Sequence, residues 1–366
     1  MRYSRGLITR LHLYFGLLSF SHFLVYGIAG LTAAVQTQRE RPKLAQSTRT
    51  VPFVAGPSQT DKQVADAVYQ ALNLPFSRPM PDWFLKRTPE HHLLLDFYNI
   101  NGIHRVTVLE NEAKVRIEEI RGSPWLFLED MHAMTGEDGE HFRLIRLWSW
   151  YNRFATWTLI GMTLSGLLIW LQTRPRPFRL ARTSHLFTGL ITAPFLLIFG
   201  ISAVQMIHRG WFPMQPAKSQ MQLTEPAGQE NVRALAASLM RRDLIRGEID
   251  FAQSTPASLK LRTTQPAANF DVAYDRATGQ TTIKTATLGT MAVLNRLHHT
   301  AGLWHDYWPN QIWNGVLVFV SLGLTGLGGT GLWLWFERRR DRALGFVLLT
   351  VSIGFSLTVL ILIRYP

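Results

Sequence analysis

Histidines occupy matching positions in two long apolar stretches, and imidazole is a common axial ligand of haem iron. Aligning His12 with His185 also superposes Gly16 on Gly189, so the two stretches share one pattern. Each histidine lies at the end of a stretch that is long enough to cross a bilayer as a helix. Two symmetry-related imidazoles can approach one iron atom from opposite faces. We therefore predict that His12 and His185 hold one b-type haem between them.

A second pair of histidines precedes the apolar stretch that ends each half of the chain. The segment 131–136 aligns with the segment 297–302, which places His132 over His298. Ionisable residues at membrane depth are usually functional. We therefore predict a second bis-histidine haem site formed by His132 and His298. His299 is the alternative to His298, because the pattern alone does not separate the two neighbours.

Two further histidines lie in the apolar stretches without a matching partner. His22 aligns with Phe195 and lies on another helical face than His12, while His208 aligns with Val35. Each is a candidate cofactor ligand. The alternatives are a hydrogen-bonded interior histidine for His22 and a membrane-interface residue for His208. The remaining histidines near the first polar segment are predicted to be surface residues: His91, His92, His104 and His141.

Long apolar runs alternate with polar sequence along the 366 residues, which indicates a multi-pass membrane protein. Helices must position the histidines at the two edges of the bilayer. The predicted transmembrane helices cover residues 1–36, 148–174, 183–208, 312–337 and 343–364, and the predicted polar domains cover residues 37–147 and 209–311.

Each polar domain shows periodic patterns of a small α+β fold. In the first domain the sequence predicts a linker over 42–57, a helix over 61–72 and strands over 91–100, 103–110 and 114–120. In the second domain it predicts a helix over 229–243 and a β-hairpin over 270–285.

The net charge of +13 is concentrated beside the apolar runs, which argues against a nucleic-acid partner. Positive charge in short loops marks the cytoplasmic side of a membrane protein. We therefore expect a cytoplasmic N-terminus and two polar domains outside. The clustered arginines are Arg2, Arg5, Arg10, Arg174, Arg176, Arg179, Arg182, Arg338, Arg339, Arg340 and Arg342.

The absence of cysteine excludes disulfides, cysteine-ligated clusters and haem attachment through C-x-x-C-H. The run Gly326–Gly331 has the spacing G-x-G-x-x-G, but it lies inside an apolar run without a βαβ unit. No nicotinamide or flavin domain is recognisable. Electrons would therefore have to come from another protein or from a membrane quinol.

The order of span, polar domain, histidine segment and span occurs twice, and this arrangement resembles the PepSY-associated transmembrane family. Members of that family include iron-regulated inner-membrane proteins and ferric-siderophore reductases. The residues that carry the resemblance are Leu11, His12 and Gly16, then Ser184, His185 and Gly189, then Leu297, His298, His299 and Gly302, then Thr330–Trp333, and the hairpin run 272–280.

The resemblance implies a mainly α membrane protein with a four-helix transmembrane core. That core comes from two span–PepSY-like domain–span repeats, to which a fifth span is added. Two small α+β domains would lie in the periplasm of a bacterium, beyond its inner membrane. The family also implies two b-type haems that carry electrons from the inside to a periplasmic ferric chelate.

The expected function is therefore the reduction of a ferric siderophore, or another ferric chelate, by an inner-membrane dihaem protein. The expected donor is a cytoplasmic protein or a membrane quinol. The main alternative is a non-redox protein whose PepSY-like domains bind a partner while the helices serve as an anchor or transporter accessory. Another is a haem-bearing electron carrier for a different periplasmic acceptor.

Overall fold

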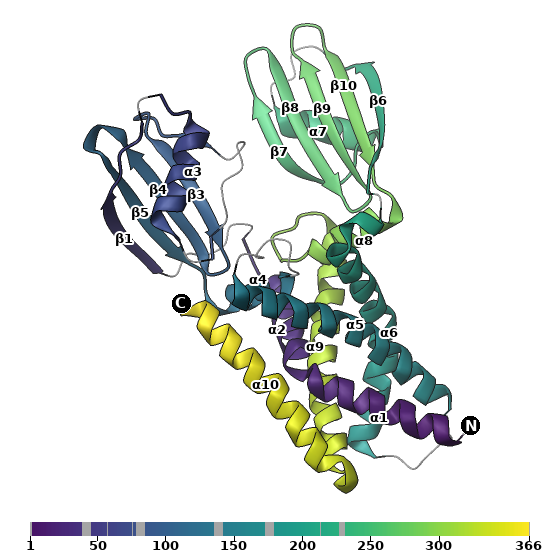
Figure 1. Ribbon diagram of the computed structural model, residues 1–366. Helices are drawn as coiled ribbons and strands as arrows, with labels where there is room; N and C mark the ends of the chain where they lie inside the picture. The colour runs from purple at the N-terminus through teal and green to yellow at the C-terminus, as the bar shows by residue number, and fades with distance from the viewer. Residues whose placement is uncertain are drawn as a thin grey trace. The chain divides into compact units, whose positions relative to one another are not determined.

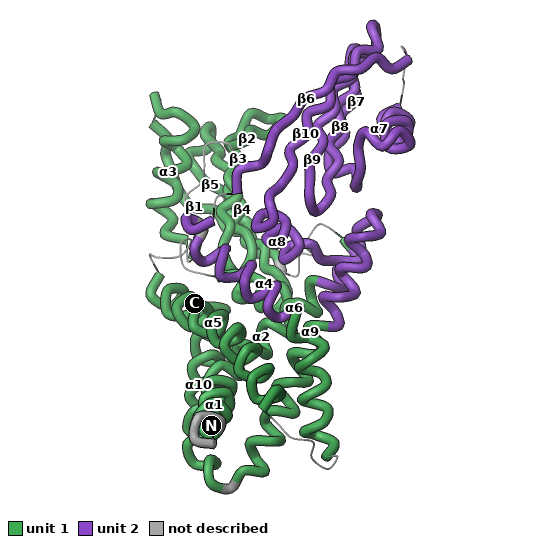
Figure 2. The backbone as a smooth tube through the Cα atoms, turned by 90° about the vertical axis from the view of Figure 1, so that its right-hand side faces the viewer, with its two compact units in different colours: residues 1–33, 38–194, 320–366 green, residues 34–37, 195–319 purple. Residues whose placement is uncertain are grey.

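The computed structural model describes residues 2–38, 45–56, 58–74, 76–77, 85–134, 142–172, 179–212, 214–226 and 231–365 (Figure 1). The chain divides into two compact units (Figure 2). Unit 1 contains Met1–Ala33, Gln38–Pro194 and Val320–Pro366, and unit 2 contains Ala34–Thr37 and Phe195–Phe319.

Within the described residues, four helices are long and apolar enough to cross a membrane. They are α5 (Arg143–Leu171), α6 (Leu180–Ile207), α9 (Trp308–Phe336) and α10 (Arg342–Arg364). Each contains most of one apolar run, so the helices predicted for the second to fifth runs are confirmed as helices. The length and apolar composition of the runs explain this agreement, because a transmembrane helix needs about 20 residues that can be buried in lipid.

The first apolar run, which was expected to form one transmembrane helix over 1–36, is broken in the structure. It forms α1 (Arg2–Leu18) and α2 (Phe20–Ala34), whose axes are bent by 63°. Side chains of other helices form hydrogen bonds with the backbone groups at the break. Tyr151 of α5 donates to the carbonyl of Leu18, and the amide of Ser21 donates to Ser352 Oγ of α10 at 3.2 Å. Insertion of such partners into the helical ladder bends a helix.

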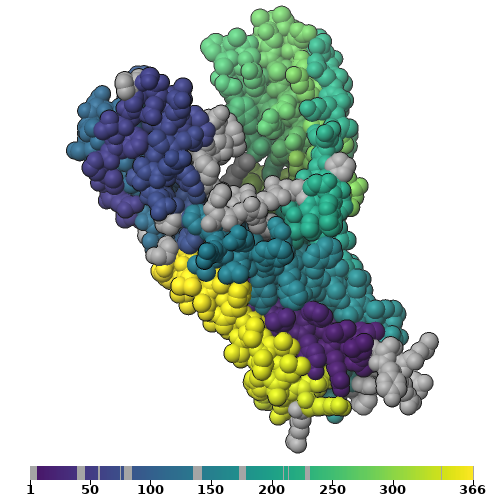
Figure 3. Space-filling view, viewed as in Figure 1, coloured from purple at the N-terminus to yellow at the C-terminus, as the bar shows by residue number. Residues whose placement is uncertain are grey.

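The helix α10 packs along α1 and α2. Ser21 Oγ lies 2.8 Å from both Ser352 Oγ and Ser356 Oγ, and the Tyr14 hydroxyl donates to Asp341 Oδ1 at 3.0 Å. In the space-filling view, α1 in dark purple lies against α10 in yellow (Figure 3). The fifth predicted span therefore holds the bent first run in place.

Among its described residues, unit 1 contains a five-stranded antiparallel sheet in the order β1-β5-β4-β3-β2. The strands are β1 (Ala45–Pro52), β2 (Lys86–Arg87), β3 (Leu93–Asn99), β4 (Gly102–Leu109) and β5 (Lys114–Arg121). Helix α3 (Asp61–Leu72) covers one face and confirms the helix predicted there. Its Val64 and Val68 pack on Leu93, Leu95 and Ile117.

The linker predicted over 42–57 is wrong over part of its length, because β1 pairs with β5 there. The described side chains of Gln46 to Thr50 are exposed, so this edge strand has no apolar alternation that a pattern could detect. The turn at Asn101-Gly102 joins β3 to β4. Gly102 has a φ of +146°, a conformation that favours glycine.

Unit 2 repeats this architecture in the part of it that is described, with the strand order β6-β10-β9-β8-β7. The strands are β6 (Ala217–Thr224), β7 (Glu248–Ser254), β8 (Ser258–Gln265), β9 (Ala268–Asp275) and β10 (Gln280–Thr287). Helix α7 (Val232–Arg241) covers one face, and its Leu235 and Leu239 pack on Leu259, Leu261 and Tyr274. The hairpin predicted over 270–285 is confirmed as β9 and β10.

Short helices join the sheets to the long helices. They are α4 (Pro124–Ala133), α8 (Thr290–His299) and the 3-10 turns η2 (Glu110–Glu112), η3 (Arg209–Trp211) and η4 (Arg339–Asp341). Because α4 ends just before α5 and α8 just before α9, the histidines that they carry lie next to a long helix in sequence.

Candidate functional site

His12 and His185 lie close together inside unit 1, although 173 positions separate them in the sequence. Their ring centroids are 6.4 Å apart and their planes are nearly perpendicular, at 83°. His12 comes from α1 and His185 from α6. The alignment of the two apolar runs therefore identified two side chains that face one another.

Each of these rings forms a hydrogen bond through its Nδ1 atom with a hydroxyl on another helix. His12 Nδ1 lies 2.8 Å from Ser165 Oγ of α5, and His185 Nδ1 lies 2.9 Å from Thr330 Oγ1 of α9. These partners occupy equivalent positions in the two halves of the sequence. The same contact is therefore made twice, once by each half of the chain.

The proton positions follow from the second bond of each hydroxyl. Ser165 Oγ donates to the carbonyl of Met162 at 3.1 Å, and Thr330 Oγ1 donates to the carbonyl of Gly326 at 2.7 Å. A hydroxyl has one proton, so each oxygen accepts from the histidine and Nδ1 carries the hydrogen. Nε2 then carries the lone pair, which is the state of a ring that binds a metal through Nε2.

A glycine lies beside each of the two rings. A Cβ atom at Gly166 would stand 3.4 Å from His12 Cε1, and one at Gly331 would stand 3.5 Å from His185 Cε1. Any side chain larger than a methyl group would press on the imidazole. The Ser/Thr-Gly pairs therefore combine a hydrogen-bond partner with the space that the ring needs.

The geometry of the pair fits ligation of one metal ion by both rings. An imidazole nitrogen lies roughly 2 Å from a bound transition metal, so two rings on opposite sides of one ion have centres roughly 6 Å apart. The observed separation of 6.4 Å agrees with that value. His12 and His185, with their Nε2 lone pairs, are therefore suited to be the two axial ligands of a haem.

His132 lies in α4, at the other end of α5 from Ser165. Asn152 Nδ2 of α5 donates to the carbonyl of His132 at 2.8 Å, and Trp148 Nε1 donates to the carbonyl of Met131 at 2.7 Å. The ring of Tyr26 lies 5.6 Å from the His132 ring in an edge-on arrangement. These bonds fix the end of α4 against the helix that follows it.

His298 lies in α8 in a matching environment within unit 2. Its Nδ1 is 2.7 Å from Ser202 Oγ, which itself donates to the carbonyl of Phe199 at 2.9 Å. Trp313 Nε1 donates to the carbonyl of Leu297 at 2.7 Å, as Trp148 does at the residue before His132. His132 and His298 belong to different units, so their pairing remains a prediction.

The two alternative ligands in unit 2 have other contacts. His299 is exposed, and its Nε2 lies 3.1 Å from the sulfur of Met206. His208 stacks on Trp211 with a centroid separation of 4.0 Å and an angle of 7°. The Ser202 hydroxyl that accepts from His298 Nδ1 supports His298 as the ligand.

His22 is fully buried in α2, at 0% exposure. The rings of Trp148 and Tyr151 lie 4.3 and 4.0 Å from it. Neither ring nitrogen has a hydrogen-bond partner among the described residues. His22 is therefore an interior histidine, but among the described residues it lacks the hydrogen bond that was expected in that alternative. An unsatisfied buried polar atom costs roughly 1–3 kcal/mol, so His22 is a candidate for a further bound group.

The prediction that His104 is a surface residue is wrong. This residue of β4 is 6% exposed, and its Nδ1 lies 3.0 Å from Ser77 Oγ and 3.1 Å from Asn99 Nδ2. Burial lowers the pKa of His104. Its place in a short alternating strand did not reveal that it faces inwards. His91 is exposed as expected, and His141 lies outside the described residues.

The supporting residues were not identified as functional from the sequence. Ser165 and Thr330 were recognisable only as part of the repeated Ser/Thr-Gly-Leu motif. Ser202 has no counterpart in that motif. The signal for the first two was their equivalent position in the two halves, since a repeat that keeps a hydroxyl beside glycine twice implies a shared contact.

Comparison with protein families gives a match over most of the chain. The family model described as PepSY-associated TM region matches residues 9–338, which is most of the chain and includes His12, His132, His185 and His298. No curated protein matches the chain.

Proposed function

We propose, since this chain belongs to the family of PepSY-associated TM regions, that it is a multi-pass membrane protein which reduces ferric chelates with two b-type haems. Electrons would pass from a cytoplasmic protein or a membrane quinol to a ferric siderophore, or another ferric chelate, in the periplasm. The membrane in question would be the bacterial inner membrane.

The observation that carries this proposal is the contact between His12 and His185. Two imidazoles with centroids 6.4 Å apart, each with Nδ1 bonded to a hydroxyl, have the spacing and tautomer of paired axial ligands. An anchor or a partner-binding protein needs no such arrangement.

The residues have distinct roles in this proposal. His12 and His185 hold one haem, and His132 and His298 hold the other. When bound, haem would supply one-electron redox chemistry. Ser165, Thr330 and Ser202 orient their imidazoles, and the rings of Tyr26 and Phe199 lie beside His132 and His298. No protein side chain has to react with the substrate.

The duplicated contacts favour a scaffold of two related halves. Both sheets have the same strand order, and α3 and α7 each follow the first strand of their sheet. The arginine clusters lie beside the ends of the long helices, which favours a cytoplasmic N-terminus and periplasmic sheets. That orientation would place the haem of His12 and His185 at the cytoplasmic edge.

Iron release would follow from the change in charge of the metal. The hard oxygen donors of a siderophore bind Fe(III) far more strongly than Fe(II). One electron from the reduced protein converts Fe(III) to Fe(II), and the chelate then exchanges the metal.

The experiment is a spectroscopic titration of the purified full chain in detergent. Dithionite should produce the sharp visible bands of reduced low-spin haem, and anaerobic ferric citrate should return the oxidised spectrum. A ferrous-specific chelator in the mixture should report about one Fe(II) for each haem oxidised. A colourless protein prepared with ample haem supply would overturn the proposal and leave the anchor or partner-binding function. Reduced haem that ferric chelates fail to oxidise would favour another acceptor.

A further inference from the structure

We propose that the uncovered face of the second sheet binds a ferric chelate of net negative charge, and that Lys260, Arg262 and Lys284 supply the attraction. This inference rests on the proposed function and deepens it, because it assigns the class of substrate and the surface that receives it. All residues concerned lie in unit 2.

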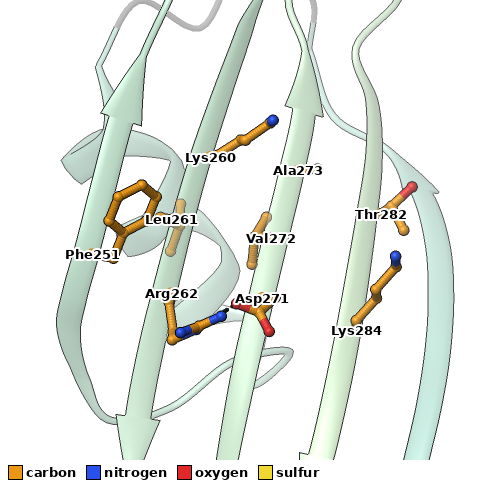
Figure 4. A pocket seen from close by; sticks show the side chains of 9 residues that line it. All are labelled: Phe251, Lys260, Leu261, Arg262, Asp271, Val272, Ala273, Thr282 and Lys284. Carbon is orange, nitrogen blue, oxygen red and sulfur yellow. Dashed lines mark hydrogen bonds and ion pairs between the residues drawn. The ribbon is translucent and has the colours of Figure 1, made fainter. Parts of the chain in front are cut away.

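The face opposite α7 contains an open pocket of about 270 Å³ (Figure 4). Its side chains come from four neighbouring strands, β7 to β10. Strand pairing sets them in two rows across the sheet. One row runs Phe251, Arg262, Asp271, Lys284, and the next runs Gln253, Lys260, Ala273, Thr282. Ala273 lies in the middle of its row, where its small side chain leaves the hollow.

The charges in this pocket are unequal. Arg262 Nε donates to Asp271 Oδ1 at 2.6 Å, so that pair is neutral overall. Lys260 and Lys284 have no carboxylate partner among the described residues. Asp271 is the acidic residue of the lining, so the pocket carries a net positive charge. Two ammonium groups flanking a hollow attract an anion, and lysine acts on oxygen anions as a point charge.

The first sheet provides a comparison because its topology is the same. At the equivalent positions Arg105 bonds to Asp96 at 2.7 Å, and the next residue across the sheet is Glu118. Glu118 therefore stands where Lys284 stands in the second sheet. The row in the first sheet has one basic and two acidic residues. The positive pocket is thus a property of the second sheet and not of the fold.

The remaining lining determines the kind of anion. Phe251 is 51% exposed and offers an aromatic face, while Thr282 offers a hydroxyl. Ligand pockets commonly measure about 300–1,000 Å³, so this smaller and open hollow suits a compact chelate or one arm of a large one. A ferric complex of carboxylate or other anionic oxygen donors has the required charge and size. A cationic trihydroxamate complex would be repelled.

The test uses gallium(III) citrate, because Ga(III) resembles Fe(III) in charge and size but is not reduced. Its binding to the purified full chain is measured by calorimetry at low and high salt. The account predicts binding that weakens with salt. It also predicts a loss of affinity of about tenfold or more in the double variant Lys260→Gln/Lys284→Gln. The matched control, Lys86→Gln/Lys114→Gln on the first sheet, removes the same charge and should bind as the wild type does.

Either of two results would overturn the inference: no binding to the wild type, or equal losses in both double variants. Oxidation of the dithionite-reduced protein by ferricyanide tests the haem proposal separately. Lys260→Gln/Lys284→Gln should leave the haem content of the purified protein and its dithionite-reduced spectrum unchanged. A pigment-free chain that binds gallium citrate in the predicted pattern would refute the reductase function while it supports this anion site.

Discussion

At the scale of single residues, the central feature is a hydroxyl that accepts from an imidazole and donates to a carbonyl of its own helix. Ser165, Thr330 and Ser202 all make this pair of bonds. The second bond matters because it leaves the hydroxyl no proton for Nδ1. Through the hydroxyl, the rigid helix backbone thereby fixes which nitrogen of each ring carries the hydrogen.

Loss of one of these hydroxyls should weaken the bound haem without unfolding the helix. For Thr330→Val we expect haem affinity to fall by roughly 10–100-fold, because a group that hydrogen-bonds a metal-ligating histidine contributes about that much. The measurement is transfer of haem from the detergent-solubilised variant to an excess of apomyoglobin. Thr163→Val is the control, since Thr163 Oγ1 donates to the carbonyl of Leu159 in its own helix at 2.8 Å. Equal haem loss in both variants would contradict the assigned role.

His104 makes the first sheet sensitive to acid. Asn99 Nδ2 can only donate, and its orientation is fixed because Asn99 Oδ1 accepts from the amide of Asn101 at 2.6 Å. Nδ1 of His104 therefore accepts and is unprotonated. Burial lowers the pKa of His104 in the folded state, so the unfolded chain binds more protons below a pH of about 6.5. Stability should fall as the pH drops through that value.

Hydrogen exchange of the β3 and β4 amides measures this dependence on the full chain. We expect their protection to decrease between pH 7.5 and 5.5 by more than the chemical exchange rate explains. His104→Gln removes the titrating group, so its protection should depend less on pH. A pH dependence as large as that of the wild type would show that another group is responsible.

At the scale of elements, close approach of helices depends on particular glycines. Gly345, near the start of α10, faces the Trp335 indole so closely that a Cβ atom would overlap it. Gly354, farther along the same helix, has nothing within 4 Å of that position. The two glycines therefore differ in packing while sharing a helix.

Gly345→Ala should destabilise the protein by roughly 1–3 kcal/mol, which is typical of overpacking. Gly354→Ala should be neutral or stabilising by up to about 1 kcal/mol, because alanine has the higher helix propensity. Thermal unfolding in detergent compares them directly. A lower unfolding temperature for Gly354→Ala than for Gly345→Ala would show that α10 does not pack on Trp335 as described.

The sequence was sufficient for elements whose pattern is local. The helix over 61–72 has apolar residues on one face and a Thr60–Gln63 capping box, and α3 occupies those residues. The long helices were predictable from the length and apolar composition of their runs. The break between α1 and α2 could not be predicted, because it depends on Tyr151 and Ser352, which come from distant parts of the chain.

The edge strand β1 and the hydroxyl partners of the histidines could not be predicted from the sequence either. Residues 46–50 of the strand β1 are all polar, so only its pairing with β5 identifies it. For the candidate site, an alignment of the two halves was enough to bring His12 and His185 together. Their hydroxyl partners required the structure, since a serine within a span has many possible roles.

At the scale of the whole molecule, two halves of one chain repeat the same set of contacts. Trp148 and Trp313 each bond the carbonyl that precedes a histidine, and Ser165 and Thr330 each hold another histidine. A duplication of this kind predicts cofactor sites that lie between the halves. It also predicts that damage to one histidine of a pair removes one haem and leaves the other.

The measurement that tests this most directly is the haem content of purified wild type, His12→Ala and His185→Ala, by the pyridine haemochrome assay. The account predicts two haems per chain in the wild type and about one in each variant. The control His91→Asn, at an exposed histidine with positive φ, should retain the wild-type content. Wild-type haem content in His12→Ala and His185→Ala would contradict the account.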